Sequence, residues 1–187
     1  RQVAPDGLRF YVIRIGYPVA NIEDNIPLLI GSIMGNIMSM PYLKLLDIDF
    51  PKKYVDKFQG PKFGIQGIRD ILGAYDRPLL NNMIKPCTGY TPDVGAKLFF
   101  EAAAGGVDVI KDDELIGGDR SFNKLADRVK ANMDAAHRAE EVKGEKTLYA
   151  CNITDEISRL KDNAMTVIEN GGNCIMLDVH GVGYSAV

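Results

Sequence analysis

Apolar residues fall into short runs separated by longer segments of helical period. Residues 79–86 and 107–110 predict short strands, and residues 92–104 between them carry a helical pattern. The same order repeats farther along, with a charged amphipathic helix expected at residues 127–142, a strand at 147–154, a helix at 156–170 and a strand at 174–181. Strands that alternate with helices in this way predict an α/β fold with a parallel sheet.

The beginning of the chain follows a different pattern. Residues 8–18 alternate well enough between apolar and polar side chains to predict a strand, which Pro18 ends. Residues 43–50 predict a second strand, closed by Pro51. The intervening residues 25–38 predict a helix, because apolar positions recur there at helical spacing after an early proline.

Glycine and proline gather at residues 58–65, which predicts a boundary between two units. We therefore expect two domains, residues 1–60 and residues 61–187. A helix over residues 65–74 is expected to lead into the first strand of the second domain.

Composition narrows the class of protein. The chain has 187 residues, 46% of them hydrophobic and 25% charged, with a formal net charge of -3, as in an ordinary globular protein. We expect no nucleic-acid partner, because there is no basic run, and no membrane association, because no apolar run is long enough to cross a bilayer and no secretory leader is seen. The three cysteines lack metal-ligand spacing and suggest reduced thiols in the cytoplasm.

A cluster of charges ends the strand at residues 107–110. Lys111, Asp112, Asp113 and Glu114 follow it directly, and strand alternation places Lys111 and Asp113 on one side and Asp112 on the other. Sites in parallel α/β folds are built at the carboxyl ends of strands, and carboxylates there suit a hard divalent cation. A neutral lysine amine that adds carbon dioxide becomes a carbamate, which is an anionic oxygen ligand. The alternative is a solvated strand end.

A second lysine, Lys85, ends the preceding strand, so a βαβ unit would carry both amines at one rim. The pattern Ile84-Lys85-Pro86, followed by Gly105-Gly106-Val107-Asp108-Val109-Ile110-Lys111-Asp112-Asp113-Glu114, resembles the first two barrel strands of the ribulose-bisphosphate carboxylase large subunit. The resemblance runs from about Phe10 to Val187. It implies about the first four strands of a (β/α)8 TIM barrel, preceded by the end of a small α+β amino-terminal domain. A complete barrel needs about 250 residues, so we expect a partial chain.

The resemblance also implies a site. Mg2+ would be held by carbamylated Lys111 with Asp113 and Glu114, and the catalytic residues would be Lys85 and Lys111. Lys85 would act as acid or base, with its pKa pulled toward neutrality by the cation and by partial burial. Mg2+ would favour removal of a proton next to a substrate carbonyl.

Three further residues match positions of the family. Asn36 would reach the substrate of a partner subunit, which implies a homodimer or higher oligomer with a shared active site. Asn152 would lie close to the metal shell in a supporting role, grouped with Asn36 and Lys85 as substrate-binding. Asp178 would organise the outer shell of the metal. From the residues alone, Asn36 is equally a polar residue at a helix end, and Asn152 a turn residue.

One position departs from the carboxylase pattern. True carboxylases carry a second lysine two residues after the first, where this chain has Cys87. The change is similar to RuBisCO-like proteins, which run other enolisation chemistry on phosphorylated sugars or sugar acids. Sulfur-salvage enolases of that group place a lysine where this chain has Asn36, which counts against that reaction. We therefore expect a phosphorylated ketose or sugar-acid isomerase or decarboxylase. The alternatives are a true carboxylase and a catalytically silent metabolite-binding or assembly subunit.

Overall fold

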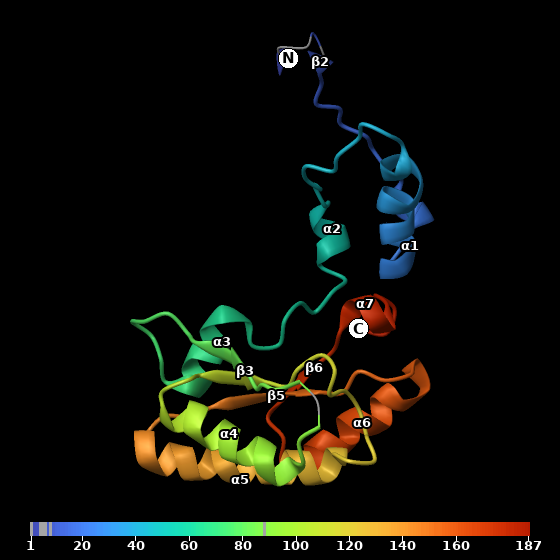
Figure 1. Cartoon of the computed structure of the whole chain (residues 1–187). Helices are drawn as coiled ribbons and strands as arrows, with labels where there is room; N and C mark the ends of the chain where they lie inside the picture. The colour runs from blue at the N-terminus through green and yellow to red at the C-terminus, as the bar shows by residue number, and fades with distance from the viewer. Residues whose placement is uncertain (1, 4–6, 8, 88) are drawn as a thin grey trace. The chain divides into compact units, whose positions relative to one another are not determined.

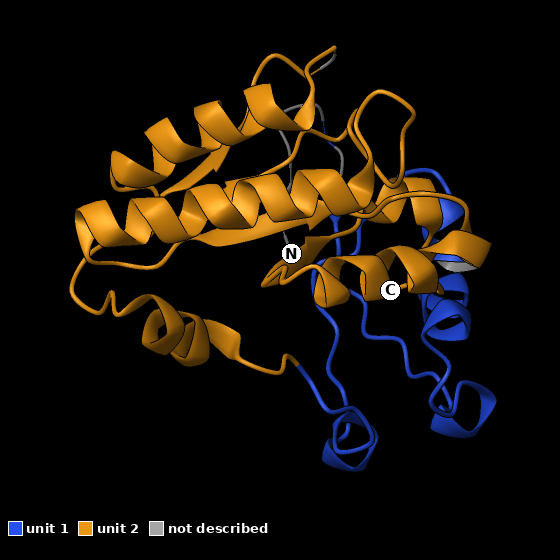
Figure 2. Cartoon of the chain, turned by 90° about the horizontal axis from the view of Figure 1, so that it is seen from below, with its two compact units in different colours: residues 1–60 blue, residues 61–187 orange. Residues whose placement is uncertain are grey.

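The computed structural model describes residues 2–3, 7, 9–87 and 89–187, and the side chains of residues 2, 3, 36 and 37 lie outside that description. The chain divides into two compact units, Arg1–Gly60 and Pro61–Val187, which Figure 2 colours separately.

The second unit is built on a parallel sheet of four strands in the order β3-β4-β5-β6. The strands are β3 (Asn81–Met83), β4 (Val109–Lys111), β5 (Leu148–Asn152) and β6 (Cys174–Met176). The connecting helices are α4 (Pro92–Ala104), α5 (Leu125–Lys143) and α6 (Ile157–Glu169), and all three lie on the same face of the sheet (Figure 1). Sequential strand order with the connecting helices on one face is the arrangement of a (β/α)8 barrel, so the predicted fold class is confirmed.

The helices of this unit end where the sequence gives them a stop. α5 ends at Gly144, whose φ of 77° lies in the left-handed region and whose N–H bonds the Glu140 carbonyl. α3 (Gly64–Leu72), which leads into β3, ends in the same way at Gly73 with a φ of 68°. The predicted helices at 65–74, 92–104, 127–142 and 156–170 are therefore confirmed within a few residues.

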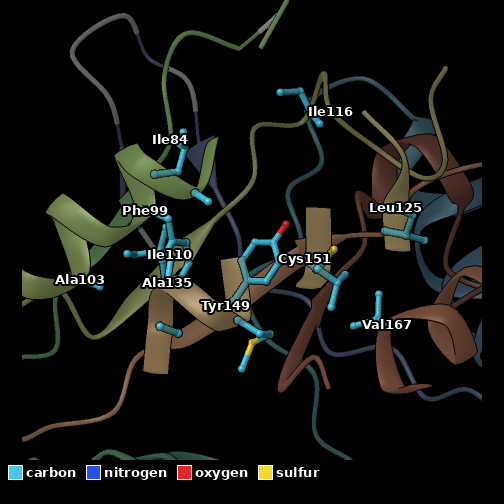
Figure 3. Packing of buried hydrophobic residues seen from close by; sticks show 14 of the residues in the cluster. Ile84, Phe99, Ala103, Ile110, Ile116, Leu125, Ala135, Tyr149, Cys151 and Val167 are labelled. Atoms are coloured by element: carbon cyan, nitrogen blue, oxygen red, sulfur yellow. The ribbon is translucent and has the colours of Figure 1, made fainter. Parts of the chain in front are cut away.

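The two middle strands of the sheet pack on both faces. Ile110 and Tyr149 face the helices with Phe99 of α4, whose ring meets Tyr149 edge-on at 5.5 Å between centroids. Figure 3 shows the Tyr149 ring in the middle of this cluster. The neighbouring strand residues Val109 and Leu148 point to the opposite face and pack in a second cluster with residues of α3 and the segments beside it. Alternate residues of one strand thus serve two different layers.

The last predicted strand is shorter than expected. Residues 174–181 were expected to be extended, but β6 ends at Met176 and α7 (Val179–Val182) follows. The physical reason is a local cap, because the Asp178 side chain accepts a hydrogen bond from the N–H of His180 and opens this helical turn.

The first unit contains the expected helix. A helical segment runs through α1 (Ile26–Ile30), the wider π-type turn η2 (Gly31–Asn36) and η3 (Ile37–Ser39). Asn25 caps it by accepting a 2.8 Å hydrogen bond from the N–H of Leu28. The short elements around it are β1 (Gln2–Val3), η1 (Val19–Asn21) and α2 (Lys52–Val55).

The prediction of two strands in this unit is largely wrong. Within the described residues 9–18 only β2 (Arg9–Phe10) is a strand, paired antiparallel with β1, and residues 43–50 contain none. A strand needs a neighbour for its backbone groups, and these segments meet through the side chains of Arg14 and Asp49, 3.2 Å apart, without a ladder. Their apolar residues are exposed, with Val12 at 86% and Leu46 at 68%. The alternating pattern is thus present without a sheet to bury it.

Candidate metal centre

The two lysines singled out from the sequence lie at the same rim of the sheet. Met83, the last residue of β3, pairs with Lys111, the last residue of β4, and the N–H of Ile84 donates to the Lys111 carbonyl at 3.2 Å. Lys85 follows directly, so both amines stand at the carboxyl ends of neighbouring parallel strands. The barrel geometry dictates this placement, because parallel strands end on the same side.

Each lysine is bonded to a carboxylate of the following loop. Lys85 Nζ forms an ion pair with Asp113, and Lys111 Nζ lies 2.6 Å from Glu114 Oε1. Lys111 also bonds the Asp112 carbonyl at 3.3 Å and the Met176 sulfur at 3.6 Å. The structure therefore brings Lys85, Lys111, Asp113 and Glu114 together.

These pairs change the pKa values of their members. Burial acts to raise the pKa of Asp113, but the hydrogen bonds from Lys85 and from the N–H of Leu115 outweigh it and hold that pKa below its usual range. The hydrogen bond from Lys111 lowers the pKa of Glu114. The hydrogen bond to Asp113 raises the pKa of Lys85. The partial burial expected of Lys85 is not found, because its side chain is 61% exposed. The shift of its pKa toward neutrality was expected mainly from an adjacent cation and stays a prediction.

Asp112 points away from this group, as strand alternation predicts. It is 1% exposed and accepts hydrogen bonds from Arg128 Nε at 3.2 Å, Tyr149 Oη at 2.9 Å and the N–H of Asn152 at 3.0 Å. Burial raises its pKa, and the Arg128 charge opposes that rise. Of the three consecutive acids, only Asp113 and Glu114 therefore lie at the rim with the two lysines.

Asn152 lies under the loop that carries these acids. Its side chain is fully buried, and Nδ2 donates to the carbonyls of Asp113 at 3.1 Å and Glu114 at 3.3 Å. Its Oδ1 accepts from the N–H of Thr154 at 3.0 Å. The supporting role expected of Asn152 has a physical basis here, whereas direct contact with a substrate would require breaking these bonds.

Of the other two predicted residues, Asp178 bonds to residues outside the group, and Asn36 belongs to the first unit. Asp178 caps α7, and its own N–H donates to Thr154 Oγ1 at 2.9 Å. Asn36 ends η2 in the first unit, and its side chain lies outside the described residues. Their expected roles stay predictions.

Arg128 and Tyr149 were not singled out from the sequence. The sequence could have indicated a buried Arg128, because it lies in the apolar stripe of α5 with Leu125 and Val129. An arginine at a buried position needs a partner of opposite charge. That partner is Asp112, which strand alternation had placed on the other side from Lys111 and Asp113.

The donor set at the rim fits a hard divalent cation. Asp113 and Glu114 present carboxylate oxygens, which Mg2+ prefers, and positive charge already faces both of them from the two lysines. A cation would take over the charge balance that the lysines now provide.

The fold and this rim define a (β/α)8-barrel protein with a charged site at the carboxyl ends of its strands. The sequence model described as ribulose bisphosphate carboxylase large chain, catalytic domain, matches residues 64–187, and the one for the amino-terminal domain matches residues 2–54. The chain belongs to the RuBisCO large-chain family.

Relatives of two kinds are similar to this chain. The ribulose bisphosphate carboxylase-like protein of Archaeoglobus fulgidus is 49% identical over 94% of this chain, which spans 40% of that relative. The rubisco-like protein MtnW of Alicyclobacillus acidocaldarius has a solved structure with a TM-score of 0.81 and 36% identity, covering 91% of this chain and 43% of that one. The dimeric archaeal Rubisco of Hyperthermus butylicus also gives a TM-score of 0.81, with 38% identity, 91% of this chain and 40% of that chain. The chain thus spans about two-fifths of the relatives that it matches.

No helix within the described residues has the length and apolar character needed to span a membrane.

Proposed function

We propose that the full-length protein is a RuBisCO-like enzyme that uses Mg2+ to enolise a phosphorylated ketose or sugar acid, as an isomerase or decarboxylase. The observation that carries the proposal is the pairing of Lys85 with Asp113 and of Lys111 with Glu114 at one rim of the sheet. Charged side chains with shifted pKa values, gathered at the carboxyl ends of parallel strands, are typical of functional sites. Similarity to RuBisCO-like proteins supports the class of chemistry.

In this proposal Lys111 supplies the third oxygen ligand. The described residues hold no cluster of three or more His, Cys, Asp or Glu side chains suited to a metal, so a carbamate on Lys111 would be the oxygen ligand added to the two carboxylates. The neutral Lys111 amine would add to carbon dioxide, forming an N–C bond and releasing one proton. The carbamate, Asp113 and Glu114 would then hold Mg2+. When bound, the ion would lower the free energy of the anion formed next to a substrate carbonyl.

Lys85 would handle the proton. Paired with Asp113 it is an ammonium, which donates a proton. To accept one it must first become neutral, which is easier once the Asp113 charge is balanced by a metal. Asn152 would keep Asp113 and Glu114 in place through their backbone carbonyls.

The assembly and compartment belong to the same proposal. We infer a homodimer or higher oligomer in which Asn36 reaches the substrate of the partner subunit, an inference that the dimeric archaeal relative supports. Cys87, Cys151 and Cys174 are free thiols, which suits the cytoplasm.

Carboxylation of ribulose bisphosphate is the second candidate, favoured by the 38% identity to an archaeal Rubisco. Cys87 weighs against it, because a thiol brings no fixed positive charge to a carboxylated intermediate.

The test is calorimetry of Mg2+ binding to the full-length protein, with and without bicarbonate. Bicarbonate should strengthen binding in the native protein, and Lys111→Ala should abolish that effect. Lys161→Ala, which removes an exposed lysine of α6, is the matched control and should behave like the native protein. A screen of sugar phosphates for deuterium exchange next to the carbonyl then identifies the substrate.

Two results would contradict the proposal. Mg2+ binding that is indifferent to bicarbonate and to Lys111 would remove the carbamate site. Binding without deuterium exchange on any sugar phosphate or sugar acid would favour a silent metabolite-binding subunit.

A further inference from the structure

The loop that carries the proposed ligands leaves the sheet at Asp112. The last ladder bond on that strand runs from the N–H of Asp112 to the Ala150 carbonyl at 3.2 Å. Beyond this point Asp113 and Glu114 have no neighbouring strand. Their positions depend on what holds the loop from inside.

Arg128 is the centre of that inner support. It is 1% exposed, and besides Asp112 its guanidinium bonds the carbonyls of Gly118, Asn123 and Asn152, each at 3.2 Å. One buried side chain of α5 thus ties the beginning of the loop, two later points of the same loop and the end of β5. Arginine suits this task because its planar fork presents five donors in fixed directions.

Tyr149 completes the support from the strand side. Its hydroxyl lies 2.9 Å from both carboxylate oxygens of Asp112, and its ring is fully buried in the core. The Asp112 carboxylate is therefore held by α5 and β5 at once. Consecutive strand residues point to opposite faces of the sheet. Holding Asp112 on the face toward the helices therefore turns Lys111 and Asp113 to the opposite face, at the rim.

We propose that Arg128 and Tyr149 are positioning residues for the metal centre, which they serve through Asp112 without touching the metal or substrate. Nothing in the rim itself requires a buried arginine and tyrosine. The inference rests on the proposed function for the identity of the group that is positioned, but the positioning itself concerns the loop and is measurable without metal.

Tyr149→Phe in the full-length protein is the test. It keeps the ring and removes only the hydroxyl, whereas Arg128→Met would leave a buried carboxylate without its charge partner and can prevent folding. The matched control is Thr147→Val, which removes another buried hydroxyl two residues away, where Thr147 Oγ1 bonds the Val107 carbonyl at 3.1 Å at the other end of the sheet.

Two readouts are needed. Amide hydrogen exchange follows the N–H groups of Leu115 and Gly118, which bond Asp113 Oδ1 at 2.9 Å and the Asn152 carbonyl at 3.1 Å. Calorimetry with Mg2+ and bicarbonate, together with the 13C signal of a carbamate formed from labelled bicarbonate, reports on the ligands. We expect Tyr149→Phe to speed exchange at both amides and to weaken Mg2+ binding by about tenfold, as for other residues that orient metal ligands. Thr147→Val should change neither.

The outcomes separate this inference from the proposed function. Equal exchange and equal Mg2+ affinity in the two variants would overturn it and make the network purely structural. If the native protein binds no Mg2+, the proposed function fails, and the exchange rates alone decide whether Tyr149 positions the loop.

Discussion

The two ends of the sheet hold their charges in different ways. At the amino end Asp108, 1% exposed, accepts two bonds from Arg77 at 2.7 and 2.8 Å and one from the N–H of Leu80 at 2.8 Å, and Arg77 also bonds Glu145. At the carboxyl end Asp113 is held by a lysine whose side chain is 61% exposed. An arginine fork fixes a carboxylate, whereas a lysine on a flexible stem releases one more easily.

This difference separates stability from chemistry. Both aspartates have lowered pKa values, but Asp108 owes its shift first to the Arg77 hydrogen bonds, while Asp113 has to overcome its own burial before Lys85 lowers its pKa. The ion pair at the amino end is thus suited to stabilising the fold. The pair at the carboxyl end can be replaced more easily by another ligand, and barrels generally place their sites at that end.

The largest effect is expected from Arg77→Ala. It leaves Asp108, which is 1% exposed, without its charge partner and should lower the free energy of unfolding more than the other changes below. Urea denaturation of the full-length protein measures it. Lys124→Ala, which breaks the exposed pair with Asp119, is the control and should cost about 0.5 kcal/mol. Equal losses would erase the contrast between buried and exposed pairs.

The loss of stability in acid should also differ between Asp108 and Asp113. A carboxyl whose pKa is lower in the folded state contributes stability above its unfolded pKa of about 3.9, and that contribution is lost as the pH falls through the folded pKa. Asp108→Asn should therefore flatten the loss of stability on the acid side. Asp113→Asn should flatten it less, because water screens the exposed Lys85. Denaturation curves between neutral pH and acid test this, and a larger effect from Asp113→Asn would contradict it.

The smallest effect is expected from Lys85→Met. The lysine is mostly exposed and its charge is screened by water, so its loss should change the free energy of unfolding less than either change above. Lys85→Arg, which keeps the charge, serves as the control in the same denaturation experiment. A loss as large as that of Arg77→Ala would mean that the carboxyl end is as permanent as the amino end.

Most of the second unit could be predicted from the sequence. Strand segments such as 107–110 pack on both faces, and the helices α4 and α5 end at glycines. The spacing of apolar residues and the positions of the helix ends therefore predict the same elements. In the first unit the alternating pattern at residues 11–18 and 43–50 predicted strands wrongly, because pattern shows which residues could line a sheet but not whether partner strands are there.

The rim could be predicted only in part. Strand alternation correctly sent Asp112 to one side and Lys111 with Asp113 to the other. The pKa direction of Lys85 could not be found in this way, because it depends on which carboxylate its flexible side chain meets. Nor could the bonds of Arg128, which join residues far apart in the chain to one guanidinium group.

The alternation at Lys111, Asp112 and Asp113 has a consequence for how such proteins diverge. The residue that the core needs and the residues at the rim occupy different positions of one strand end, so Lys111 or Asp113 can be replaced without removing the buried bonds of Asp112. Under the proposed function, a single substitution at Lys111 or Asp113 would remove the activity and leave the barrel folded, which would be a short mutational route between active enzymes and inactive descendants of the same fold.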